Sequence, residues 1–187
     1  MSHRKAVLLF TNSDFGQANV FLATTYELLR QDTLDIHIAS WPQLQPRLDD
    51  LAERVQQENP DLKLSPIQFH NLADSPGLAR FLETLGEKNK ADVPHPPGRL
   101  GAERIAMLTS RCLTIWEPEQ HLSIFDWSAD LARQLDPALI VVDPFLVPVH
   151  DMARTFKRSY AVLTPCSLAD GLIPQQPWFA AWWKYPA

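Results

Sequence analysis

The chain has 187 residues, of which 45% are hydrophobic, and this length and composition suit one domain with a substantial core. It carries 17 Lys and Arg against 22 Asp and Glu, a formal charge of -5, and it has no basic run interleaved with aromatics, which disfavours a nucleic-acid partner. No stretch approaches the roughly 18 uncharged residues that span a bilayer, and the apolar run 6–10 is too short for a signal peptide. We therefore expect a soluble, cytoplasmic protein.

Five short apolar runs alternate with helical patterns along the chain. The candidate strands cover residues 5–11, 35–40, 64–70, 139–143 and 160–164. Strands that alternate with helices build parallel sheets with helical crossovers. The sequence therefore predicts an α/β fold with a Rossmann-like parallel sheet.

Helical patterns fill the segments between these runs. Apolar stripes predict helices over 76–86, 47–58, 105–115 and 124–131, each with its stripe facing the core. The run 20–23 is apolar on all sides, so we expect it to be covered on more than one side. Residues 89–101 hold three prolines and two glycines and indicate a connector or a flap, and the aromatic tail 178–187 needs a surface to cover it.

Cysteines and histidines give no sign of a metal site. Cys112 and Cys166 lack CxxC spacing and fit two unlinked thiols in a reducing compartment, although a disulfide between them stays open. The histidines form no HExxH motif. We expect each of them to be structural or solvated: His3, His37, His70, His95, His121 and His150.

Asp143 ends the run ALIVVD, at the carboxyl end of a predicted parallel strand. Ligands of open α/β sheets gather outside these ends, which favours a functional role; the alternative is an N-cap or loop carboxylate before Pro144. The loop TNSDFGQ leads into a helix whose amino terminus could receive an anion. It contains neither GxGxxG nor GxxxxGK[ST], and Ser167 stands in no GxSxG elbow.

Three stretches carry a resemblance: KAVLLFTNSDFGQANVFLATTYELLRQDTLDIHIAS, ALIVVDPFLVPVHDMARTFKRSYAVLTP and WKYPA. Together they resemble the amino-terminal half of a UDP-glucosyl/glucuronosyltransferase of the GT-B fold. That family has two facing Rossmann-like domains, the first binding an acceptor and the second gripping the UDP-sugar. The resemblance implies that residues 1–187 form a single, truncated acceptor-side domain and that the carboxyl-terminal donor-binding domain is absent.

The resemblance also assigns roles to two residues. In the family a histidine at the start of the first helix takes the proton of the acceptor hydroxyl, an aspartate orients that histidine, and the sugar is transferred with inversion and without a metal. Asp143 matches the aspartate, and Gln17 stands at the histidine position. A carboxamide cannot accept a proton near neutral pH, so another base is needed, and Asp14 or Asp143 are the nearest candidates.

The expected function is UDP-sugar-dependent transfer of a hexose to a hydroxyl of a small lipophilic acceptor, with Phe15, Gly16 and Asn19 shaping the acceptor loop and no cofactor beyond the UDP-sugar substrate. The chain alone is expected to be inactive. One alternative is a non-catalytic fragment that binds small apolar molecules or a separate donor-domain chain. Another is a different nucleotide-binding α/β class such as an oxidoreductase, which the missing glycine fingerprint weakens.

Overall fold

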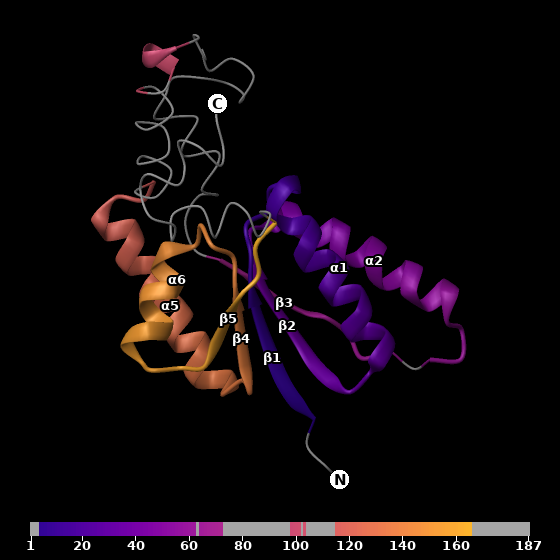
Figure 1. Cartoon of the computed structure of the whole chain (residues 1–187). Helices are drawn as coiled ribbons and strands as arrows, with labels where there is room; N and C mark the ends of the chain where they lie inside the picture. The colour runs from indigo at the N-terminus through magenta and orange to yellow at the C-terminus, as the bar shows by residue number, and fades with distance from the viewer. Residues whose placement is uncertain (1–3, 63, 73–97, 102, 104–114, 166–187) are drawn as a thin grey trace, which may run out of the picture.

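A computed structural model describes residues 4–62, 64–72, 98–101, 103 and 115–165. Its centre is a parallel sheet of five strands in the order β3-β2-β1-β4-β5 (Figure 1). The strands are β1 Lys5–Phe10, β2 Leu34–Ser40, β3 Gln68–Asn71, β4 Leu139–Val142 and β5 Tyr160–Val162. All five predicted strands are confirmed, and β3 begins four residues later than the sequence indicated.

The described helices are α1 Phe15–Gln31, α2 Gln45–Glu58, which follows the 3-10 turn Pro42–Leu44, α5 Pro118–Leu135 and α6 Val147–Thr155. The predicted helix 47–58 is confirmed as α2, which begins two residues earlier, and the stripe 124–131 lies within α5. Residues 76–86, nearly all of 105–115, most of 89–101 and the tail 178–187 lie outside the described residues, as do Cys112, Cys166 and Ser167. None of the helices in the described part of the chain is long and apolar enough to cross a membrane.

The sequence analysis did not predict α6. This helix has nine residues and begins directly after the turn that holds Pro144, with Pro148 in its first turn. Proline is tolerated there because the first amides of a helix have no intrahelical partner. Two turns are too short to show a full apolar period, so the segment resembles a loop in the sequence. Val149 and Met152 are nevertheless fully buried against the sheet.

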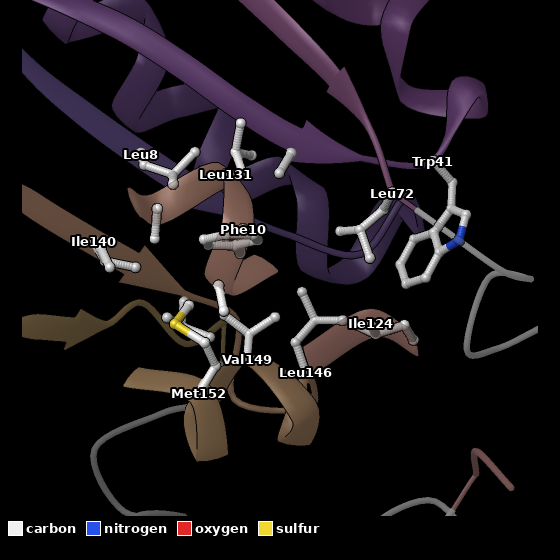
Figure 2. Packing of buried hydrophobic residues seen from close by; sticks show 14 of the residues in the cluster. Leu8, Phe10, Trp41, Leu72, Ile124, Leu131, Ile140, Leu146, Val149 and Met152 are labelled. Carbon is white, nitrogen blue, oxygen red and sulfur yellow. The ribbon is translucent and has the colours of Figure 1, made fainter. Parts of the chain in front are cut away.

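Helices cover both faces of the sheet. In Figure 1, α1 and α2 lie on one face, and α5 and α6 lie on the other. Successive residues of β1 alternate between two cores: Leu8 and Phe10 belong to the α5/α6 core, shown in Figure 2, and Val7 and Leu9 to the α1/α2 core. This double burial explains why β1 is an unbroken apolar run.

The run 20–23 is only partly covered. Phe21 is buried and Val20 and Leu22 are half-buried, but Ala23 is exposed. The helix α2 contacts α1, and Val20 and Leu22 pack against the α1/α2 core, so the expected cover besides the sheet is present for part of the run and is missing at Ala23. A single helix face packs on the sheet, and the opposite face of α1 is open at this residue.

The strand order decides where a site can form. β1 lies at the centre, with β2 on one side and β4 on the other, so the chain changes direction across the sheet between β1 and β4. The connections that leave the carboxyl ends of these two strands run to opposite faces, and in open α/β sheets ligands bind at the crevice expected at such a point. These connections are the β1–α1 loop, with Asp14, and the β4–α6 turn, with Asp143.

Candidate functional site

The β1–α1 loop starts as a continuation of the strand. The amide of Thr11 donates to the carbonyl of Ala39 at 3.1 Å, and Thr11 and Asn12 are both buried. Asp14 is the N-cap of α1: its backbone is extended, and its carbonyl accepts from the amides of Gln17 at 3.1 Å and Ala18 at 2.8 Å. The side chain of Asp14 makes no capping hydrogen bond and is half-buried at the mouth of the helix.

Asp143 is fully buried beside this loop. Its amide donates to the carbonyl of Phe10 at 2.9 Å, which extends the β1–β4 pairing by one residue. Its Oδ1 accepts from the amide of Phe145 at 2.9 Å, the geometry of an Asx turn. Its Oδ2 is buried and has no hydrogen-bond partner among the described residues. The loop-carboxylate alternative thus accounts for Oδ1, and the backbone and side chain of Asn12 lie near the carboxylate, but Oδ2 makes no well-formed hydrogen bond.

The environment of Asp143 raises the pKa of its carboxyl. Burial raises the pKa of this carboxyl from 3.8 to about 6, and the nearby charge of Asp14 acts in the same direction. The amide of Phe145 and the groups of Asn12 favour the ionised form and offset only part of this rise in pKa. Asp143 is therefore mostly ionised at pH 7 but is a stronger base than an ordinary aspartate.

His150 anchors the β4–α6 turn from within α6. Its Nε2 lies 3.1 Å from the backbone carbonyl of Asp143, which also accepts from the amide of Leu146 at 3.0 Å. Burial lowers the pKa of His150, so the ring is neutral at pH 7 and its Nε2–H donates to that carbonyl. Its Nδ1 is buried and has no partner among the described residues. His150 is a structural histidine, as expected for the histidines in general.

Gln17 is the third residue of α1, in its first turn, and is half-buried. Among the described residues no hydrogen bond joins its side chain to Asp143. A Cβ added at Gly16 would meet no atom within 4 Å, and Gly16 does not have a positive φ. Neither packing nor backbone conformation of this domain requires glycine there, so the position leaves open room beside Gln17.

Phe15 and Asn19 are held by an arginine that the sequence analysis missed. Phe15 is 73% exposed, and the guanidinium carbon of Arg47 lies 4.2 Å from the centre of its ring. Nη2 of Arg47 donates to Oδ1 of Asn19 at 2.5 Å. Arg47 stands in the first turn of α2, 28 residues after Asn19, so local sequence gives no signal for this contact.

The structure also brings together two histidines that the sequence treated separately. Nδ1 of His37 in β2 lies 3.0 Å from Nε2 of His70 in β3. Burial lowers the pKa of both rings, so the pair is neutral at pH 7 and one ring donates to the other. Within the ranges that the structure describes, no group of three or more histidine, cysteine, aspartate or glutamate residues could hold a metal ion.

Comparisons with known proteins agree with this fold. A protein named "Glycosyltransferase sdnJ" from Sordaria araneosa is 59% identical over 186 residues, which cover 98% of this chain and 36% of that protein. This chain thus spans about a third of that relative. No family model matches the chain.

Solved glycosyltransferases share the fold at low identity. VinC in complex with dTDP superposes with a TM-score of 0.53 at 12% identity, covering 91% of this chain and 37% of VinC. The spinosyn rhamnosyltransferase SpnG complexed with spinosyn aglycone gives a TM-score of 0.52 at 10% identity, covering 90% of this chain and 37% of SpnG. The chain therefore has the fold of the amino-terminal, Rossmann-like half of GT-B glycosyltransferases, and its sequence is similar over nearly its whole length to a protein named as a glycosyltransferase.

Proposed function

We propose that the chain supplies the acceptor side of an inverting, metal-independent glycosyltransferase of the UDP-glucosyl/glucuronosyltransferase type. The reaction moves a hexose from a nucleotide diphosphate sugar to a hydroxyl of a small lipophilic acceptor. The acceptor binds at the crevice between the β1–α1 loop and the β4–α6 turn. The relative named as a glycosyltransferase, at 59% identity, supports the reaction class.

The observation that carries this proposal is the unpartnered Oδ2 of Asp143. A carboxylate oxygen that is buried without a hydrogen bond destabilises a fold, so such a group calls for an explanation outside the fold. By the resemblance of the sequence, Asp143 matches the aspartate that orients a histidine in the glycosyltransferase family. Here the corresponding position is Gln17, and no hydrogen bond from its side chain reaches Asp143. If Asp143 once paired with a histidine at position 17, replacement of that histidine by glutamine would leave one buried carboxylate oxygen without a hydrogen bond.

The proposed chemistry is a single displacement. The acceptor hydroxyl oxygen forms a bond to the anomeric carbon, the bond from that carbon to the diphosphate breaks, and the nucleoside diphosphate leaves with the electron pair. Gln17 donates or accepts a hydrogen bond that orients the hydroxyl but cannot take its proton. We assign the proton to Asp14, because it is half-buried at the mouth of α1, whereas Asp143 is fully buried.

The solved relatives support the two substrate classes. VinC was solved with dTDP and SpnG with a spinosyn aglycone, a nucleotide and an acceptor respectively. The apolar, exposed ring of Phe15 and the open room at Gly16 suit a lipophilic acceptor. The donor site belongs to a domain that the 187 residues do not resemble, so we propose no turnover by these residues alone.

A chimaera tests the proposal. This chain replaces the matching 36% of the Sordaria araneosa relative, and the remainder of that protein supplies the donor side. We expect release of nucleoside diphosphate and an acceptor heavier by one sugar, both measured by mass spectrometry with the acceptor of the relative. An inactive but folded chimaera beside an active relative would contradict the proposal. Turnover of UDP-glucose by the 187 residues alone would contradict the proposed inactivity.

A non-catalytic role is the second candidate, and the glutamine at position 17 is the observation that favours it. A domain without a proton acceptor still binds small apolar molecules or a donor-domain chain. The chimaera separates the two roles, because a binding protein would hold the acceptor without transferring sugar to it. In that case Asp14→Asn would leave acceptor binding unchanged and there would be no activity to lose.

A further inference from the structure

We propose that Arg47 is a positioning residue that fixes Phe15 and Asn19 as one wall of the acceptor subsite. The free face of the Phe15 ring then receives a flat, apolar ring of the acceptor. This inference rests on the proposed function. It adds a positioning residue from a second helix, α2, and it names the part of the acceptor that binds, a flat apolar ring.

The ring of Phe15 needs a partner to stay in place. It is the first residue of α1 and is 73% exposed, so the apolar core does not hold it. The guanidinium of Arg47 lies over the ring at 4.2 Å from its centre, a cation–π arrangement. The guanidinium covers one face of the ring, and the large exposed fraction leaves the opposite face open to a ligand.

Arg47 itself is held by the wall and not by an acidic residue. Its Nη2 donates to Oδ1 of Asn19 at 2.5 Å, and its Nη1 has no partner among the described residues. None of the ion pairs between described residues includes Arg47. The planar group therefore joins Phe15 and Asn19, which lie four residues apart on one face of α1.

Arg54 shows the difference within the same helix. Its Nε donates to Oε1 of Glu58 at 2.9 Å, an i,i+4 surface ion pair, and its side chain is 72% exposed. Such pairs stabilise a helix slightly and have no ligand to position. Arg54 is therefore the matched control for Arg47, with equal charge, the same helix and no contact with α1 residues 15–19.

The geometry of the wall predicts what it binds. Gly16, next to Phe15, leaves room that no atom of this domain fills. An aromatic ring offset on Phe15 could extend over this room toward Gln17. Affinity for a flat aromatic acceptor should fall about 10-fold when the ring of Phe15 is removed, because stacking is lost. It should fall about 3- to 5-fold when the guanidinium of Arg47 is removed, because the ring of Phe15 is no longer held in place.

The test titrates 4-methylumbelliferone, a flat phenol, with the 187-residue chain and follows its fluorescence. We expect Phe15→Ala to raise Kd about 10-fold and Arg47→Ala about 3- to 5-fold, with the double variant no weaker than Phe15→Ala. Arg47→Lys restores part of the loss, and Arg54→Ala binds like the unaltered chain. All variants keep the unaltered melting temperature within about 2 °C, because surface changes alter stability little.

Three outcomes would overturn this inference. Additive losses in the double variant would show that Arg47 does not act through Phe15. Equal affinity of Arg47→Ala and the unaltered chain would show that the guanidinium positions nothing. Failure of the unaltered chain to bind the phenol would contradict the proposed acceptor role itself and this inference with it, whereas the first two outcomes contradict this inference alone.

Discussion

The two strand-to-helix connections at the carboxyl edge of the sheet use the same residue type in opposite ways. In the β4–α6 turn, Asp143 is fully buried, and its amide, its carbonyl and one carboxylate oxygen are all hydrogen-bonded. In the β1–α1 loop, Asp14 uses its backbone carbonyl to start α1, while its half-buried side chain makes no cap. Asp143 is enclosed within its turn, whereas Asp14 is only half-buried, and this difference in burial is the basis for assigning the acceptor proton to Asp14.

These two aspartates show what a position at the end of a parallel strand decides and what it leaves open. An acidic residue at the end of a parallel strand has the right location for catalysis, but its burial decides whether it can touch a substrate. Asp143 has the location and a raised pKa, and Asp14 has the access. Four substitutions test this division, in order of decreasing expected effect.

Asp14→Asn should abolish most of the activity of the chimaera. If Asp14 takes the acceptor proton, kcat should fall about 10²- to 10⁴-fold, which corresponds to roughly 3 to 5.5 kcal/mol of barrier. Steady-state kinetics of sugar transfer measures this loss, and Asp136→Asn, far from the crevice and exposed, is the control. A loss smaller than that of Asp143→Asn would reverse the roles that we assign to the two carboxylates.

Asp143→Asn should stabilise the domain at neutral pH. The folded-state pKa of about 6 exceeds the ordinary value of 3.8, so stability falls as pH rises through this window and the full cost persists above pH 6. Removing the charge should therefore raise the free energy of unfolding by up to about 3 kcal/mol at pH 7 and by little at pH 3.5. Urea unfolding at both pH values measures the difference; a variant less stable than the parent at pH 7 would refute the assigned pKa.

His150→Ala should destabilise the same turn. The loss of the hydrogen bond to the carbonyl of Asp143 and of a buried ring should cost about 2 kcal/mol at pH 7, whereas His121→Ala on α5 should cost little. The folded-state pKa of His150 is lowered, so its contribution to stability falls as pH drops below 6.5, opposite in sign to that of Asp143. We expect acidification from pH 7 to 5 to stabilise His150→Ala relative to the parent, and unfolding curves without this difference would contradict the burial of a neutral ring.

Gln17→His should give Asp143 its missing partner. An imidazole N–H that reaches Oδ2 favours the ionised carboxylate, so the pKa of Asp143 should fall from about 6 by about one pH unit. Carbon-13 NMR of the aspartate carboxyls measures this change, with Gln17→Leu as the variant that offers no donor. If both variants leave the pKa at about 6, residue 17 does not face Asp143, and its match to the family histidine is wrong.

The described helices show which elements local sequence patterns can predict. The apolar stripe 124–131 predicted the middle of α5, whereas its start, marked by Pro118 and by the capping box between Glu117 and Gln120, was not predicted. α6 offers only two turns and two prolines after a strand, so the same methods missed it. Its nine residues form a helix because Val149 and Met152 complete a core that includes residues of β1, β4 and α5.

The sequence by itself determined the parallel sheet and its strands, because alternation of apolar runs and helical stripes is a local property, and three of its stretches carried a resemblance to a glycosyltransferase family. It also located Asp143, Gln17, Phe15, Gly16 and Asn19 near one edge, although their roles remain proposals. Only the tertiary structure decided that Asp143 is buried with one oxygen unpartnered, that His37 meets His70, and that Arg47 covers Phe15. These contacts depend on which strands and helices become neighbours, and residues 28 or more positions apart carry no local sign of that choice.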